Sequence, residues 1–170
     1  MNVDLYAAAL PPWRSQAAAF PPADQVLWFL TGLQREGGAL LNVLHKVVFH
    51  AHTLDLDVVR DACGDFLFYL ASGCSMGGGD FPLLVRDAQL GAVPGTPRDA
   101  LVALCTCLGD VSQLGRCLVT ELGRSPWRPD AWAAFARCVQ SFLEMLVILH
   151  LSLEGVMQAN VTTLTARPAG

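Results

Sequence analysis

Residues 100–108 read ALVALCTCL, a run in which Thr106 is the single polar residue. Pro97 precedes this run and fits the first turn of a helix, so the stretch predicts a helix that is apolar on every side. The run is too short to cross a bilayer, because a spanning helix needs roughly 20 apolar residues. Such a helix is shielded from water only where other helices cover it. The run therefore predicts an all-α bundle around a central apolar helix.

The residues before this run show helical periodicity. An apolar stripe with intervals of three and four residues predicts an amphipathic helix over residues 56–70. Its members are Leu56, Val59, Cys63, Phe66 and Leu70. The glycine-rich residues 73–79 predict a loop, and Asp80 is placed to cap a short helix over residues 81–90.

Two further apolar stretches lie near the N-terminal side. Residues 24–37 have helical spacing, with Asp24 as the expected N-cap and Gly37-Gly38 as the expected stop. A second stretch over residues 39–52 continues the spacing. The pattern leaves open whether these are two helices or one bent helix.

The C-terminal part carries the remaining helical patterns. Helices are expected over about 111–122, over 129–138, and from there through about residue 157. Residues 142–153 read FLEMLVILHLSL and are interrupted by Glu144 and His150. This stretch is shorter than a spanning helix, so we interpret it as a buried or groove-facing helix, with membrane contact as the alternative.

Length and composition indicate one folded domain. The chain has 170 residues, of which 53% are hydrophobic and 15% charged, so it must bury apolar surface or hold some for a partner. The net charge is −4, and the ten arginines and Lys46 form no run of like charge, so no nucleic-acid partner is expected. We expect a Pro-rich flexible leader over residues 1–22, a helical domain over 23–158 and a C-terminal tail over 159–170.

No pattern typical of catalysis or of a cofactor site is found. The six cysteines include no CxxC pair, which favours buried reduced thiols over disulfides or a zinc site. His45 and His52 could share a helix face, but the sequence places no third metal ligand beside them. Residues 73–80 lack the ending of a phosphate loop, and no serine lies in a GxSxG motif. We therefore expect neither an enzyme nor a cofactor or metal.

Three short patterns follow one another along the chain. Residues 59–66 read VRDACGDF. Residues 84–87 read LVRD and are followed, after a turn, by PRDAL at 97–101 and the apolar run. Residues 126–127 are a Pro-Trp pair, followed by WAAF at 132–135.

In this order, the patterns resemble the third, first and second homology segments of the B-cell lymphoma-two (Bcl-two) family of apoptosis regulators. The Gly-Asp pair of the first pattern is displaced by one residue, Gly95-Thr96-Pro97 stands where the family has Asn-Trp-Gly, and Ala131 replaces a glycine. The resemblance covers residues 24–135. Its degenerate motifs and short connection between the first helices are more similar to viral members than to cellular ones.

The resemblance implies a Bcl-two-like fold and an inhibitor of apoptosis that binds death-motif (BH3-type) helices in a surface groove. It implies that Arg98 pairs with the aspartate of the ligand. The residues that would form the apolar pockets are Phe66, Leu70, Phe81, Leu84, Val85, Leu101 and Cys105. The implied partners are pro-apoptotic relatives (Bax, Bak and Bim-like death-motif proteins).

The implied location is the host cytoplasm and, through the apolar C-terminal helix, the mitochondrial outer membrane. Three other functions stay open. The same fold could serve as an adaptor that binds host innate-immune signalling proteins without using the groove, or as a pro-apoptotic pore former. An unrelated helical scaffold protein with an oligomer interface would also fit the high apolar content. The sequence does not indicate the oligomeric state.

Overall fold

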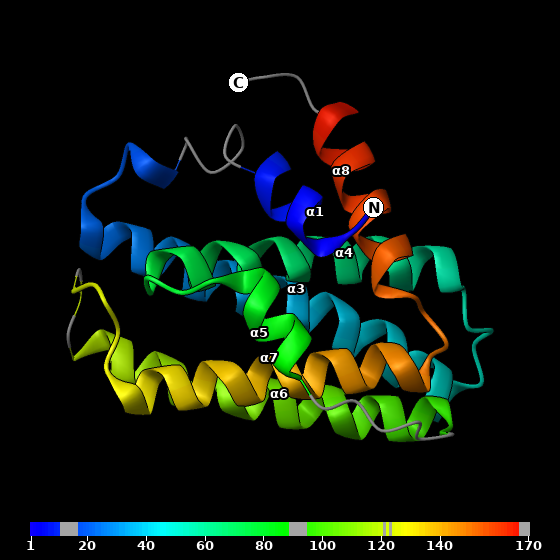
Figure 1. The fold of residues 1–170 in the computed structure, drawn as a ribbon. Coiled ribbons are helices and arrows are strands. Elements are labelled where there is room, and N and C mark those ends of the chain that lie inside the picture. The colour runs from blue at the N-terminus through cyan, green and yellow to red at the C-terminus, as the bar shows by residue number, and fades with distance from the viewer. Residues whose placement is uncertain (11–16, 89–94, 121, 123, 167–170) are drawn as a thin grey trace.

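The computed structural model describes residues 1–10, 17–88, 95–120, 122 and 124–166, and no strand occurs in these parts of the chain. The helices are α1 (Val3–Ala9), α3 (Pro22–His50), α4 (Leu56–Met76), α5 (Phe81–Asp87), α6 (Pro97–Val119), α7 (Pro129–Ile148) and α8 (Leu153–Ala166). Figure 1 shows α6 beside α7, then α3 and α4, then α1 and α8 on the opposite side. The prediction of an all-α bundle is confirmed.

Helix α3 joins the two N-terminal apolar stretches into one helix of 29 residues. It begins after Pro21 rather than at Asp24, and it ends at His50, after which Ala51 has a left-handed φ of 55°. The predicted stop at Gly37-Gly38 is wrong, because packing compensates for the low helix propensity of glycine. A Cβ at position 37 would stand 2.3 Å from Cδ2 of Leu108, so Gly37 lets α3 lie close to α6.

Helix α4 confirms the predicted amphipathic stripe except at its first member, Leu56, which is 39% exposed. Val59, Cys63, Phe66 and Leu70 are all fully buried. The helix continues to Met76, however, so the first part of the predicted loop is helical. The turn follows at Gly77 and Gly78, and the glycine at 78 has a φ of 82°. The chain then enters α5.

Helix α5 begins at the predicted cap. The Asp80 carboxylate accepts a hydrogen bond of 3.0 Å from the backbone N–H of Leu83. The helix ends at Asp87, earlier than expected. Residues 89–94, which complete the predicted helix and begin the predicted turn, lie outside the described residues.

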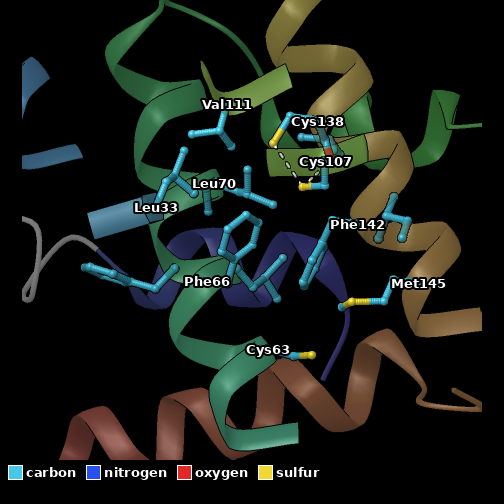
Figure 2. Packing of buried hydrophobic residues seen from close by; sticks show 14 of the residues in the cluster. Leu33, Cys63, Phe66, Leu70, Cys107, Val111, Cys138, Phe142 and Met145 are labelled. Carbon is cyan, nitrogen blue, oxygen red and sulfur yellow. Dashed lines mark hydrogen bonds between the residues drawn. The ribbon is translucent and has the colours of Figure 1, made fainter. Parts of the chain in front are cut away.

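The core lies mainly between α3, α4, α6 and α7 and extends to α1 and α8. Figure 2 shows Phe66 of α4 facing Phe142 of α7, and the two rings stack with centroids 5.1 Å apart. Cys107 of α6 and Cys138 of α7 lie nearby, with their Sγ atoms 3.4 Å apart. Aromatic pairs of this kind stabilise a core beyond their buried area, by about 0.5–1.5 kcal/mol each.

The residues of the Pro-Trp pattern have a structural role. Trp127 is buried and packs against Trp132 at 5.3 Å and against Phe29 of α3 at 5.7 Å between ring centroids. Phe135 completes this cluster through an edge contact with Trp127. The cluster holds the start of α7 against α3.

Helix α6 is not the covered axis of the bundle. Val102 is 60% exposed, and Cys105 and Thr106 are also exposed. The buried side is a single stripe of Ala100, Leu101, Leu104, Cys107, Val111, Leu114 and Leu118. The prediction that no water touches residues 100–108 is wrong, because α6 packs against α3 and α7 along one side and its other side faces solvent.

The apolar residues 142–153 do not form one helix. Helix α7 ends at Ile148, His150 has a left-handed φ of 55°, and α8 begins at Leu153. Most of the stretch is buried, as the interpretation as a core segment predicts. By length and composition alone, α6 and α7 could each cross a membrane, a test that a core helix of a soluble protein also passes.

The chain ends differ from the expected leader and tail. Within residues 1–22, α1 is a packed helix whose Tyr6 is fully buried, and Leu10 after it is buried too. The prediction of a flexible leader is therefore wrong for residues 3–10, because buried apolar side chains hold a short helix before the first Pro-Pro pair. The boundary expected after residue 158 falls inside α8, in which Asn160 and Leu164 are buried.

Candidate functional site

A groove of about 830 Å³ lies between the second half of α3 and the first half of α6. Its described lining consists of Gly38, Leu41, Asn42, His45, Phe49, Arg98, Leu101, Val102, Cys105 and Thr106. The α3 residues Leu41, His45 and Phe49 recur every four positions, so they lie on one helix face. The α6 residues form the opposite wall.

The walls of the groove expose large apolar side chains. Phe49 is 62% exposed and Val102 is 60% exposed, whereas Leu101 is 8% exposed. Exposed apolar side chains that share a concave surface are typical of binding sites for another molecule. The groove therefore has the shape and chemistry to take an apolar face of a partner.

One guanidinium stands at the edge of the groove. Arg98 is exposed in the first turn of α6, and no ion pair of Arg98 is found among the described residues. The described lining contains no aspartate or glutamate. His45 adds an imidazole ring, whose centroid lies 5.0 Å from that of Phe49. The Arg98 guanidinium favours an acidic residue on whatever molecule the groove binds.

The start of α6 is fixed by a capping box. Thr96 Oγ1 accepts a hydrogen bond from the backbone N–H of Asp99, and the Asp99 carboxylate accepts one of 2.8 Å from the backbone N–H of Thr96. The Thr96 hydroxyl also donates to the Asp99 carboxylate, at 2.7 Å. The backbone N–H and the hydroxyl of Thr96 thus lower the pKa of Asp99, and the nearby charge of Arg98 lowers it further. The cap thereby fixes the helix turn that carries Arg98.

The structure brings together three of the eight predicted site residues. Arg98, Leu101 and Cys105 line the groove. The other five lie elsewhere: Phe66, Leu70 and Phe81 are buried in the core, and Leu84 and Val85 are half-buried on α5.

The prediction that Phe66, Leu70 and Phe81 line the groove is wrong. Phe66 and Leu70 have no exposed surface and Phe81 is 4% exposed, so none of them can line an open groove. The physical reason is that α3, rather than α4, lies along α6, and the stripe of α4 turns inward to the core. Leu84 borders a separate hollow of about 290 Å³, together with Trp132.

The α3 wall of the groove was not predicted from the sequence. The sequence does carry a signal for this wall. Leu41, His45 and Phe49 are spaced four residues apart, so a histidine lies on the same helix face as two large apolar residues. Among the described residues, no three His, Cys, Asp or Glu side chains are grouped so that they could hold a metal ion. The groove is a candidate surface for binding.

The groove combines an apolar floor, exposed apolar walls and a basic edge. Comparisons of this chain with protein-family models, with curated proteins and with solved structures find no match.

Proposed function

We propose that this chain is a divergent, viral, Bcl-two-like inhibitor of apoptosis that binds an amphipathic death-motif helix of a pro-apoptotic relative in the α3–α6 groove. The observation that carries the proposal is the open apolar groove with Arg98 at its edge and no carboxylate in its described lining. Amphipathic helices bind such grooves through apolar anchors three, four and seven residues apart. The site of action would be the host cytoplasm at the mitochondrial outer membrane.

Arg98 is assigned the recognition of the ligand's aspartate. Arg98 lies beside Leu101 and Val102 in the lining of the groove. A ligand helix whose apolar side chains contact Leu101 and Val102 therefore brings its own adjacent turn to the Arg98 guanidinium. A charged pair at the edge of an apolar groove fixes the direction and register of the bound helix.

The packing of α4 favours a receptor over a pro-apoptotic ligand. In a ligand, the helix with the third homology segment must be free to enter another protein's groove. Here Gly64 lies under α8, because a Cβ at this position would stand 2.9 Å from that of Asn160. The Asp65 carboxylate accepts a hydrogen bond of 3.3 Å from the Asn160 side-chain amide. Helix α4 is thus covered on this face.

The Bcl-two-like fold is part of the proposal and rests on the order of the three sequence patterns. In the family, the helix with the third segment forms one wall of the groove. In this chain α3 takes that place and α4 lies behind it. The proposed mode of binding therefore keeps the arginine and the apolar floor of the family but has a different second wall.

Titration of the purified chain with a panel of synthetic death-motif peptides tests the proposal. We expect at least one peptide to bind with a Kd below about 10 μM. The Arg98→Ala variant should weaken that binding about fivefold or more, because it removes the charge that pairs with the ligand. Arg116→Ala is the matched control, since Arg116 is an exposed arginine of the same helix that hydrogen-bonds Gln113 and does not line the groove.

Two results would overturn this assignment. The first is a folded chain that binds no peptide of the panel below about 10 μM. The second is an equal affinity of the Arg98→Ala and Arg116→Ala variants for the peptide, which would show that Arg98 does not contribute to recognition of the ligand. A Val102→Asp variant adds a negative charge to the exposed wall and should abolish binding to an acidic ligand.

One observation favours the adaptor as a second candidate. Phe66 and Leu70 are fully buried, so the surface that the family uses beside its third segment is closed here. An adaptor would bind a host innate-immune signalling protein through an outer helix face. Its signature is direct binding to such a purified protein that the Val102→Asp variant leaves unchanged, together with no binding to the peptide panel.

A further inference from the structure

Helix α1 is docked on the rest of the protein in the manner of a bound peptide. It has seven residues, which is too short for a helix to be stable alone in water. Val3, Tyr6 and Leu10 follow one another at three- and four-residue intervals, and Tyr6 and Leu10 are fully buried. Leu5, on another face, is 60% exposed. The pattern is that of an amphipathic helix that anchors one apolar face in a partner.

Two ion pairs fix the orientation of α1. Asp4 pairs with Arg86 of α5, and the Met1 amine pairs with Glu154 of α8. The charges on the supporting helices are thus complementary to those on α1: a cation faces the acidic residue of its first turn, and an anion faces its N-terminal end.

A buried hydrogen bond sets the register of α1. The Tyr6 hydroxyl donates to Oδ1 of Asn160 at 2.8 Å, and the Asn160 side-chain amide donates in turn to Asp65 of α4. Asn160 is 2% exposed. A buried amide oxygen requires a hydrogen-bond donor, so any helix that covers this position must supply one, as Tyr6 does here through its hydroxyl.

The attachment of α1 is local. The helix packs on α5 and α8, and Figure 1 shows it on the side of the molecule opposite α6 and α7. Arg86 and Asp4 are each more than half exposed, and exposed ion pairs contribute at most about 1 kcal/mol. Tyr6 and Leu10 belong to the buried apolar cluster, so release of α1 exposes these two anchors. Because α1 is terminal, we expect it to open while α3, α4, α6 and α7 stay packed.

We infer that the surface beneath α1 is a second helix-binding site, separate from the α3–α6 groove, which α1 occupies in cis and which a helix of another protein can take. This surface, the α1 site, is formed by α5 and α8 and marked by Arg86, Glu154 and Asn160. The inference does not rest on the proposed function of the groove.

The α1 site defines the chemistry of its occupant. The partner helix carries apolar anchors at positions i, i+3 and i+7, with a tyrosine at i+3 that donates to Asn160. It carries an acidic residue at i+1 for Arg86, and a positive charge just before its first turn for Glu154. A partner helix longer than seven residues is better formed before binding than α1 and can therefore displace it.

A fluorescent peptide tests exchange at the α1 site. The probe is a synthetic peptide of residues 1–10 with a free amine, extended by helix-favouring residues and labelled at its C-terminus, and anisotropy reports its binding to the full chain. In the wild type, α1 competes at an effective concentration of the order of millimolar. The Tyr6→Ala chain keeps the site but weakens its own α1, so it should bind the peptide about tenfold or more tightly than the wild type does.

Reversal of the charges in the Asp4–Arg86 pair distinguishes specific binding of the peptide from nonspecific binding. In the Tyr6→Ala chain, Arg86→Asp should weaken binding of the peptide about fivefold, and an Asp4→Arg peptide should restore it. Arg98→Ala should leave binding unchanged, because Arg98 lines the other groove. The inference is overturned if Tyr6→Ala binds no more tightly than the wild type or if the reversed peptide gives no rescue.

Hydrogen exchange of the unmodified chain provides an independent test that needs no variant to fold. Local release predicts that the α1 amides exchange at least tenfold faster than those of α4 and α7, and that an excess of the unlabelled peptide speeds their exchange further. Exchange of α1 amides at the same rate as the α7 amides would mean that α1 opens only with global unfolding, which would overturn the inference.

Discussion

A Cβ at position 73 would stand 2.3 Å from Cε2 of Phe29, so α4 approaches α3 at this point at a distance that glycine alone permits. The Phe29 ring cannot move aside, because it is fully buried and packs against Trp127 and Phe135. The close approach of the two helices depends on this one missing methyl group.

Gly73→Ala is therefore expected to lower the free energy of unfolding by about 1–3 kcal/mol, despite the better helix propensity of alanine. Gly109→Ala is the control, because a Cβ there meets no atom within 4 Å. It should raise the free energy of unfolding by about 0.5–1 kcal/mol. Urea unfolding followed by circular dichroism measures both, and effects of the same sign would contradict the close approach.

The thiols should differ in their reactivity toward a maleimide reagent. Cys105 is exposed, while Cys63, Cys74, Cys107 and Cys138 are buried. Burial raises the pKa of Cys63, and the pKa of Cys138 is raised by its hydrogen bond with Cys107 and by burial. Because the thiolate is the reactive form, Cys105 should be labelled first under native conditions. Mass spectrometry of the labelled peptides checks the order, and early labelling of Cys138 would contradict it.

The same buried thiols predict a loss of stability at alkaline pH. Below about pH 8.5 the thiols are protonated in both states, so their contribution is fully present. Above that pH the unfolded chain releases protons that folded Cys63 and Cys138 retain, so the free energy of unfolding falls by about 1.4 kcal/mol per pH unit for each thiol. Denaturant unfolding from pH 7 to 10 measures the slope. Cys63→Ala should make it shallower, and an equal slope in that variant would exclude Cys63 as a cause.

Thr96→Ala should destabilise the first turn of α6 and, with it, the position of Arg98. Loss of the cap is expected to cost about 0.5–2 kcal/mol of stability. Thr162→Ala is the control, because Thr162 is an exposed threonine inside α8 that donates to the Gln158 carbonyl and caps no helix. Thermal unfolding compares the two variants. A Tm for Thr96→Ala equal to that of Thr162→Ala would show that the capping box contributes little.

The sequence could predict those elements whose periodic face is the buried face. The α4 stripe could be predicted because Cys63, Phe66 and Leu70 face the core. The start of α5 could be predicted because Asp80 forms a local hydrogen bond with the first turn of the helix. The continuity of α3 could not be predicted, because Gly37 is tolerated through its contact with Leu108, more than seventy residues away along the chain.

The groove could be predicted only in part, for a similar reason. Arg98, Leu101 and Cys105 follow from the start of α6, which is marked locally by Thr96 and Pro97. The opposite wall depends on which helix lies beside α6, and that choice is made by tertiary packing. The run over residues 100–108 is apolar on every side, so its sequence does not indicate which side the neighbouring helices cover. For this reason the solvent exposure of one side of α6 could not be predicted.

Asn160 also belongs to an Asn-Val-Thr sequence, the acceptor motif for N-linked glycans. In the folded chain its side chain lies between Tyr6 and Asp65 and is nearly inaccessible. A sugar on its amide nitrogen would have to occupy the space where α8 meets Gly64 of α4. Folding and glycosylation at this asparagine therefore exclude each other, and a chain modified there before α8 docks could not assemble this side of the bundle.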